Sequence, residues 1–91
     1  MDRPRVVGMA WYRREDYGRL REVMVDRERL ATTYNAWLAS AEQVANEVER
    51  SGVVVERVVI SPDEFTEWCA ARGLPCDGAA RGRFANEPLP R

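Results

Sequence analysis

The sequence contains no histidine, and its fourteen basic residues are all arginine, with no lysine. Histidine is the most frequent general base and the most frequent metal ligand of proteins, so its absence removes both roles from this chain. Arginine in place of lysine follows the codon usage of GC-rich genomes and indicates a bacterial protein. The net charge of −1 lacks the basic excess that a general nucleic-acid binder needs.

The sequence also lacks long apolar runs. No run approaches the ~20 residues that a membrane-spanning helix needs. The first residues, MDRPRVVG, have no long apolar core followed by a cleavage site, as a secretion signal would have. We therefore expect a cytoplasmic protein with no membrane partner.

Cysteine is scarce, and the two thiols, Cys69 and Cys76, are separated by six residues. This spacing matches neither a zinc half-site nor a thioredoxin motif, and there is no glycine-rich phosphate loop, so we predict no metal and no cofactor. In a reducing compartment both cysteines are expected to be free thiols. Cys69 shares a helical face with Phe65 and Trp68, which favours a packing role, and a regulatory redox pair of Cys69 with Cys76 is the alternative.

What the sequence does contain is a strong strand pattern at residues 53–60, VVVERVVI, where six of eight residues are β-branched and apolar. These residues fall on both faces of the strand, which is typical of a parallel sheet covered by helices on both sides. Ser61, Pro62 and Glu64 follow, and they predict a helix with an N-cap, a first-turn proline and a capping box. This helix should cover residues 62–72 and end at Gly73.

Apolar patterns and capping residues predict the other elements in the same way. Thr32 or Thr33 should cap a long helix that ends at Gly52, and Asp77 should cap the last helix. We expect a first strand over residues 5–12 and further helices over residues 15–25, 34–50 and 78–86. The resulting order, β-α-α-β-α-α, makes one α/β (or α+β) domain over residues 1–86, followed by a flexible tail over residues 87–91.

Two strands separated by helices favour a parallel pair joined by a right-handed crossover. A two-stranded sheet is marginal in water by itself. Either a further strand lies in a segment interpreted here as a loop, or a second subunit completes the sheet. We favour the second, because an exposed strand edge is a template for pairing and a two-fold homodimer uses it.

The carboxyl ends of parallel strands meet at one edge, where open α/β sheets bind ligands. Here that edge should hold residues 11–14 and the helix start at Ser61. The phenol, the guanidiniums and the free helix amides make Tyr12, Arg13, Arg14 and Ser61 a candidate anion-binding site. In the alternative interpretation, the two arginines are solvated surface charges and Ser61 only caps its helix. No residue is assigned a catalytic role.

Three segments, WYRREDY at residues 11–17, TYNAWL at 33–38 and SPDEFTEWC at 61–69, together resemble small bacterial proteins of uncharacterised function. The resemblance covers nearly the whole chain. It implies a bacterial, single-domain protein and brings no activity, cofactor or catalytic residue with it.

These observations leave three functional hypotheses. The first is a non-enzymatic interaction or regulatory module that acts as a homodimer and binds a further protein, because no nucleophile–base pair, metal set or phosphate loop is present. The second is a small enzyme or sensor that binds an anionic metabolite between residues 11–14 and Ser61. The third is nucleic-acid binding through Arg13, Arg14, Arg19 and Arg21, which the near-neutral charge disfavours.

Overall fold

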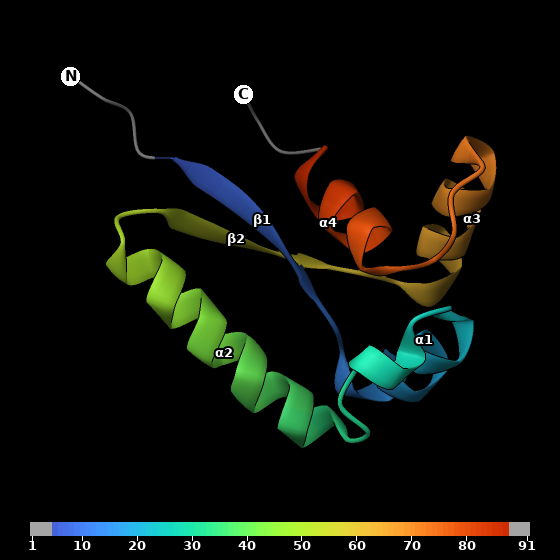
Figure 1. Cartoon of the computed structure of the whole chain (residues 1–91), viewed down its shortest axis with the longest axis horizontal. Coiled ribbons are helices and arrows are strands. Elements are labelled where there is room, and N and C mark those ends of the chain that lie inside the picture. The colour runs from blue at the N-terminus through green and yellow to red at the C-terminus, as the bar shows by residue number, and fades with distance from the viewer. Residues whose placement is uncertain (1–4, 88–91) are drawn as a thin grey trace.

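The computed structural model describes residues 5–87, and within them the chain forms a two-stranded parallel sheet with helices packed around it (Figure 1). Short 3₁₀ turns, η1 (Arg14–Asp16) and η2 (Arg27–Arg29), precede and follow the first helix. In chain order the main elements are β1 (Val6–Trp11), α1 (Tyr17–Val23), α2 (Tyr34–Arg50), β2 (Val54–Val59), α3 (Pro62–Arg72) and α4 (Gly78–Asn86). This order is the one expected from the sequence.

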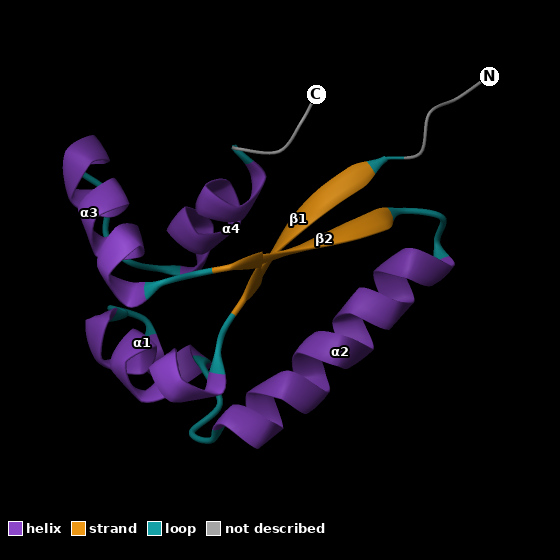
Figure 2. Cartoon of the chain, turned by 180° about the vertical axis from the view of Figure 1, so that it is seen from behind, coloured by secondary structure: helices purple, strands orange, loops and turns teal. Residues whose placement is uncertain are grey.

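The parallel pairing of the two strands is confirmed. Val6 lies opposite Val54 and Trp11 opposite Val59, so the strands match along their whole length. Helix α2 runs along one side of the strand pair and α4 lies on the other (Figure 1). Helices α1 and α3 gather at the carboxyl ends of the strands, as the view from behind also shows (Figure 2).

The core lies where these helices meet the strand ends. Its most completely buried large side chains come from α1 and the segment after it, the end of β2, and α3: Leu20, Met24, Ile60, Phe65 and Cys69. Burial of this kind contributes about 1.5–3 kcal/mol per large apolar side chain, so it is the main source of stability for the domain.

Strand β2 is less covered than the sequence predicted. Val54 and Val59 point to opposite faces of the sheet, yet they are 46% and 43% exposed, whereas Ile60 is fully buried. The reason is the width of the sheet. With only two strands, β2 lies at an edge, and each of its side chains has a neighbouring strand on one side only.

Local capping signals set most helix ends. The Thr33 hydroxyl accepts a hydrogen bond from the Ala36 N–H at 3.2 Å, and the Asp77 carboxylate accepts one from the Ala80 N–H at 2.9 Å. The predicted capping box at the start of α3 is wrong, because the Ser61 side chain makes no capping hydrogen bond. Pro62 already fixes the first helical φ at this end, so the helix starts without the box.

The predicted helix over residues 15–25 is shorter in the structure. It begins as a 3₁₀ turn and ends at Val23, after which Met24 is extended. Tertiary contacts take over at this point: the Val25 N–H donates to the Cys76 carbonyl at 2.9 Å, and Asp26 binds Arg81. The helical periodicity continues in the sequence, but these contacts to the α3–α4 segment hold the backbone away from the helix.

Within residues 5–87, no helix has the length and apolar character needed to cross a membrane. Of the predicted tail, Glu87 is described and accepts a hydrogen bond from Arg83. Residues 88–91 lie outside the described part of the chain.

Candidate functional site

The topology brings the ends of the two strands together, as the predicted anion site requires. The Ile60 N–H donates to the Trp11 carbonyl at 2.8 Å, so Tyr12 and Ser61 follow directly from neighbouring strand ends. The side chains then diverge. Tyr12 turns into the core, where its ring centroid lies 4.6 Å from that of Trp37. Arg13 is exposed, and Ser61 is half-buried.

Arg14 is directed toward the start of α2 rather than toward Ser61. Its guanidinium donates to Asn35 Oδ1 at 2.8 Å and lies 4.6 Å from the centroid of the Tyr34 ring. These two contacts fix the orientation of the Arg14 guanidinium at the start of α2. The arginine that reaches the start of α3 is Arg19, which pairs with the Asp63 carboxylate. No local signal in the sequence places Arg19 there, because Arg19 and Asp63 are 44 residues apart.

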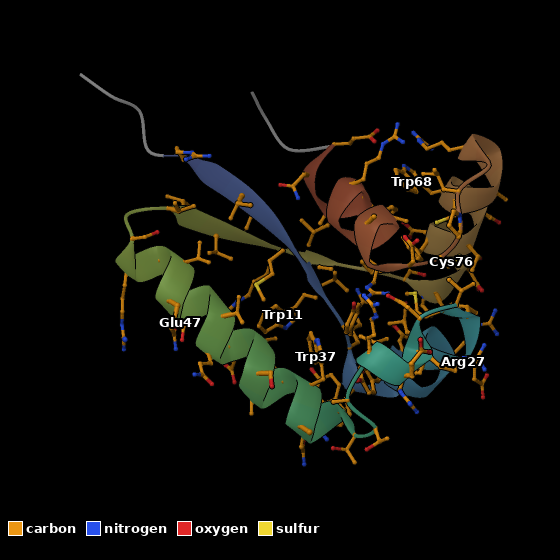
Figure 3. The ribbon with its side chains drawn as sticks, viewed as in Figure 1. Trp11, Arg27, Trp37, Glu47, Trp68 and Cys76 are labelled. Carbon is orange, nitrogen blue, oxygen red and sulfur yellow. The ribbon has the colours of Figure 1, made fainter. Side chains whose placement is uncertain are left out.

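An aromatic layer lies between β1 and α2. Trp11 and Trp37 point toward each other in Figure 3, and their ring centroids are 5.2 Å apart in an edge-to-face arrangement. The Arg57 guanidinium also lies over the Trp11 ring, 4.4 Å from its centroid. Tyr17 and Tyr34 complete this layer. Tyr17 belongs to the core, Tyr34 and Trp37 pack against it, and the half-buried Trp11 extends these ring contacts to β1, so the layer joins α2 to the sheet.

A charged clamp joins the segment after α1 to the start of α4. Arg81 donates to both Asp26 carboxylate oxygens, at 2.9 and 3.3 Å, and the Gly78 N–H donates to Asp26 Oδ2 at 3.0 Å. The hydrogen bonds from Arg81 lower the pKa of Asp26, against the opposing effect of burial. Burial raises the pKa of the nearby Tyr12 to about 12, so its phenol stays protonated at neutral pH. Asp26, Arg81 and Tyr12 therefore keep their protonation states near neutral pH and act as structural contacts.

The two cysteines are free thiols, and Cys76 packs against the core cluster that contains Cys69. Cys69 is buried in the core, whereas Cys76 is half-buried in the turn before α4. Burial, and then the hydrogen bond with the Cys76 thiol, raise the pKa of Cys69 to about 11. The expected packing role of Cys69 is thus accompanied by a thiol neighbour, which the helical pattern alone could not indicate.

The outer edge of β1 is closed by an asparagine side chain. The Arg5 and Trp11 carbonyls accept hydrogen bonds from β2, so the backbone of Gly8 points away from β2. There the Gly8 N–H donates to Asn86 Oδ1 at 2.7 Å, and Asn86 Nδ2 donates to the Gly8 carbonyl at 3.0 Å. The amide of α4 thus pairs with β1 as a neighbouring strand would, and it closes the middle of this edge.

The outer edge of β2 is different. Because the Val54 and Ile60 N–H groups donate to β1, the backbone groups of Val55, Arg57 and Val59 point away from it. Among residues 5–87, no group forms a hydrogen bond with these outward N–H and C=O groups. A row of unpaired strand groups beside exposed valines is a pairing surface.

The chain was compared with known proteins. Residues 1–90 match the model of a family described as a domain of unknown function, DUF8829. The chain belongs to this family. No curated protein and no solved structure matches it. The DUF8829 assignment covers both strands and all the described helices, and it agrees with the resemblance to uncharacterised proteins. It indicates no activity.

Proposed function

We propose that this DUF8829 protein is a non-enzymatic interaction module of the bacterial cytoplasm that works as a homodimer, with the outer edge of β2 as the dimer seam. The observation that supports this most directly is the difference between the two strand edges. Asn86 closes the edge of β1 at Gly8. At the edge of β2, the outward backbone groups of three residues have no partner within the described part of the chain: Val55, Arg57 and Val59.

Two copies that pair along β2 across a two-fold axis run antiparallel and form a four-stranded sheet. Each copy of β2 then becomes a central strand, and the exposed Val54 and Val59 side chains gain neighbours on both faces. A four-stranded sheet also avoids the marginal stability of an isolated pair of strands. The net charge of −1 leaves little repulsion between copies, which favours a second copy over a strongly charged foreign strand.

Light scattering behind a sizing column tests the proposal. We expect a mass of twice 10.4 kDa for the wild-type chain. Arg57→Pro removes an outward N–H and leaves the β1–β2 ladder in place, because Arg57 does not bond to β1 through its backbone. We expect this variant to be a folded monomer.

Arg57→Ala is the matched control. It removes the same side chain, with its contact to Trp11, but keeps the backbone N–H, so it should remain a dimer. A wild-type chain that runs as a monomer at all concentrations would contradict the homodimer. A monomer that captures an added extended peptide along β2, and loses it with Arg57→Pro, would assign the edge to a foreign strand instead.

The second candidate function is binding of a small anion by Arg13 and Arg14 near Ser61. The exposed guanidinium of Arg13 favours it, while the contacts of Arg14 to Tyr34 and Asn35 weigh against it. Its test is thermal melting with inorganic phosphate. A rise in Tm that disappears in the Arg13→Ala, Arg14→Ala double variant supports this site, and an unchanged Tm counts against it.

A further inference from the structure

The two thiols of the chain meet at the carboxyl end of α3. Cys69 lies one turn before the end of this helix, and Cys76 lies in the turn before α4. Each is a free cysteine; the Cys69 thiol interacts with the Cys76 thiol, and Cys76 packs against the core cluster that contains Cys69. This cysteine pair lies at the end of α3 and in the turn before α4, so its chemistry does not depend on the proposed dimer seam at β2.

The backbone holds both cysteines in place. Gly73 adopts the left-handed conformation, with φ 65°, and the Leu74 N–H donates to the Cys69 carbonyl at 2.9 Å. These are the features of a Schellman motif, which folds the chain back over the last turn of the helix. The Val25 N–H then donates to the Cys76 carbonyl at 2.9 Å, and this bond anchors the returning turn. The helix end therefore folds the segment that carries Cys76 back toward Cys69.

The two cysteines differ in access. Cys69 is 1% exposed, whereas Cys76 is half-buried. A small reagent in solution consequently reaches Cys76 first. Burial also keeps the Cys69 thiol protonated at neutral pH, because its pKa is raised to about 11. Reaction at Cys76, followed by attack from Cys69, is the order that this geometry permits.

We propose that Cys69 and Cys76 form a reversible intramolecular disulfide by exchange with a low-molecular-weight disulfide. The Cys76 thiolate attacks one sulfur of the reagent, so a mixed disulfide forms and one small thiolate leaves. Cys69 then loses its proton and attacks the Cys76 sulfur, which closes the protein disulfide and releases the second small thiolate. The two protons from the protein thiols end on the two released small thiols, and the reagent takes up the two electrons.

The disulfide tethers the last turn of α3 to the residue before the N-cap of α4. Helix α4 carries Arg81 of the charged clamp and Asn86 of the β1 edge. Oxidation therefore restrains the element that holds both contacts, and an excess of small thiol reverses it.

Mass spectrometry of the full chain, incubated with glutathione disulfide, tests the proposal. We expect the wild-type chain to lose two hydrogens and retain no glutathione. Cleavage after Arg57, Arg72 and Arg81 separates the cysteines onto peptides 58–72 and 73–81, which should be recovered as one linked species without reductant. Wild-type chains that accumulate a stable glutathione adduct, or that link to a second chain, would overturn the proposal.

Two variants separate the roles of the thiols. Cys69→Ala should stop at the mixed disulfide and retain one glutathione on Cys76, because the resolving thiol is gone. Cys76→Ala should react roughly tenfold more slowly than wild type, since its remaining thiol is buried. Equal rates for Cys76→Ala and wild type would contradict the assigned order. Circular dichroism shows whether Cys69→Ala folds. If it does not, the rate of Cys76→Ala and the linked peptide of the wild-type chain still test the proposal.

Discussion

Replacement of Asp26 by asparagine tests the charged clamp between the segment after α1 and the start of α4. Asp26 accepts two hydrogen bonds from Arg81 and one from the Gly78 N–H. The Asp26→Asn variant keeps the size of the side chain and removes its charge. Arg81 then remains in a site where its side chain is only 12% exposed, without a carboxylate partner.

The magnitude follows from burial. Removing one partner of a fully buried ion pair costs about 3–5 kcal/mol. This pair keeps some contact with water, since the Asp26 side chain is 17% exposed, and the asparagine oxygen still accepts one hydrogen bond. We therefore expect Asp26→Asn to lower the free energy of unfolding at pH 7 by about 2 kcal/mol, or the Tm by roughly 8–16 °C.

The loss of stability caused by Asp26→Asn should become smaller at low pH. Hydrogen bonds from Arg81 lower the pKa of Asp26 in the folded state below its ordinary value of 3.8. The stability that the charged carboxylate contributes is therefore present in full above the unfolded-state pKa. It is lost as pH falls through the folded-state pKa. The difference between wild type and Asp26→Asn should be constant from about pH 5 to 7 and shrink below about pH 4.

Urea denaturation at a fixed protein concentration measures both quantities. Asp63→Asn is the matched control, because its partner Arg19 and Asp63 are 61% and 73% exposed and their pair is screened by solvent. We expect this control to change stability by less than about 1 kcal/mol. An Asp26→Asn variant as stable as wild type at pH 7, or a difference that persists unchanged at pH 3, would refute the reasoning.

Two further predictions concern α4 and the helix caps. Asn86→Ala removes the side chain that pairs with Gly8, so we expect faster hydrogen exchange of the Gly8 amide. We also expect the free energy of unfolding to fall by about 1–3 kcal/mol. Asn46→Ala, on the exposed face of α2, is the control and should change neither quantity. Unchanged exchange at Gly8 would show that the edge is protected by something else. Thr33→Ala should cost about 1 kcal/mol in thermal or urea unfolding, because the Thr33 hydroxyl caps its helix with a hydrogen bond. Ser61→Ala should cost little, because the Ser61 side chain makes no capping hydrogen bond. Equal losses for the two variants would contradict the assigned caps.

The sequence predicted the helix bounds of α2, α3 and α4 because their signals are local. Thr33 and Asp77 bond to N–H groups three residues ahead, and Gly73 supplies the left-handed residue that ends α3. The parallel pairing also followed from chain order, since helices between two strands leave few other connections. Local signals predicted less of the candidate anion site at residues 11–14 and Ser61. Chain order placed Tyr12 and Ser61 at neighbouring strand ends, but the directions of their side chains depend on what packs around them.

The sequence by itself therefore determined the order and most of the limits of the two strands and four α-helices described, because hydrophobic periodicity and capping act over a few residues. Only the tertiary structure decided that Arg14 turns to Asn35, that Asp26 meets Arg81 across 55 residues, and that Asn86 meets Gly8 across 78. Such partners depend on the positions of whole helices, and these positions are set by packing of the entire core. The same packing closes the edge of β1 and leaves that of β2 open.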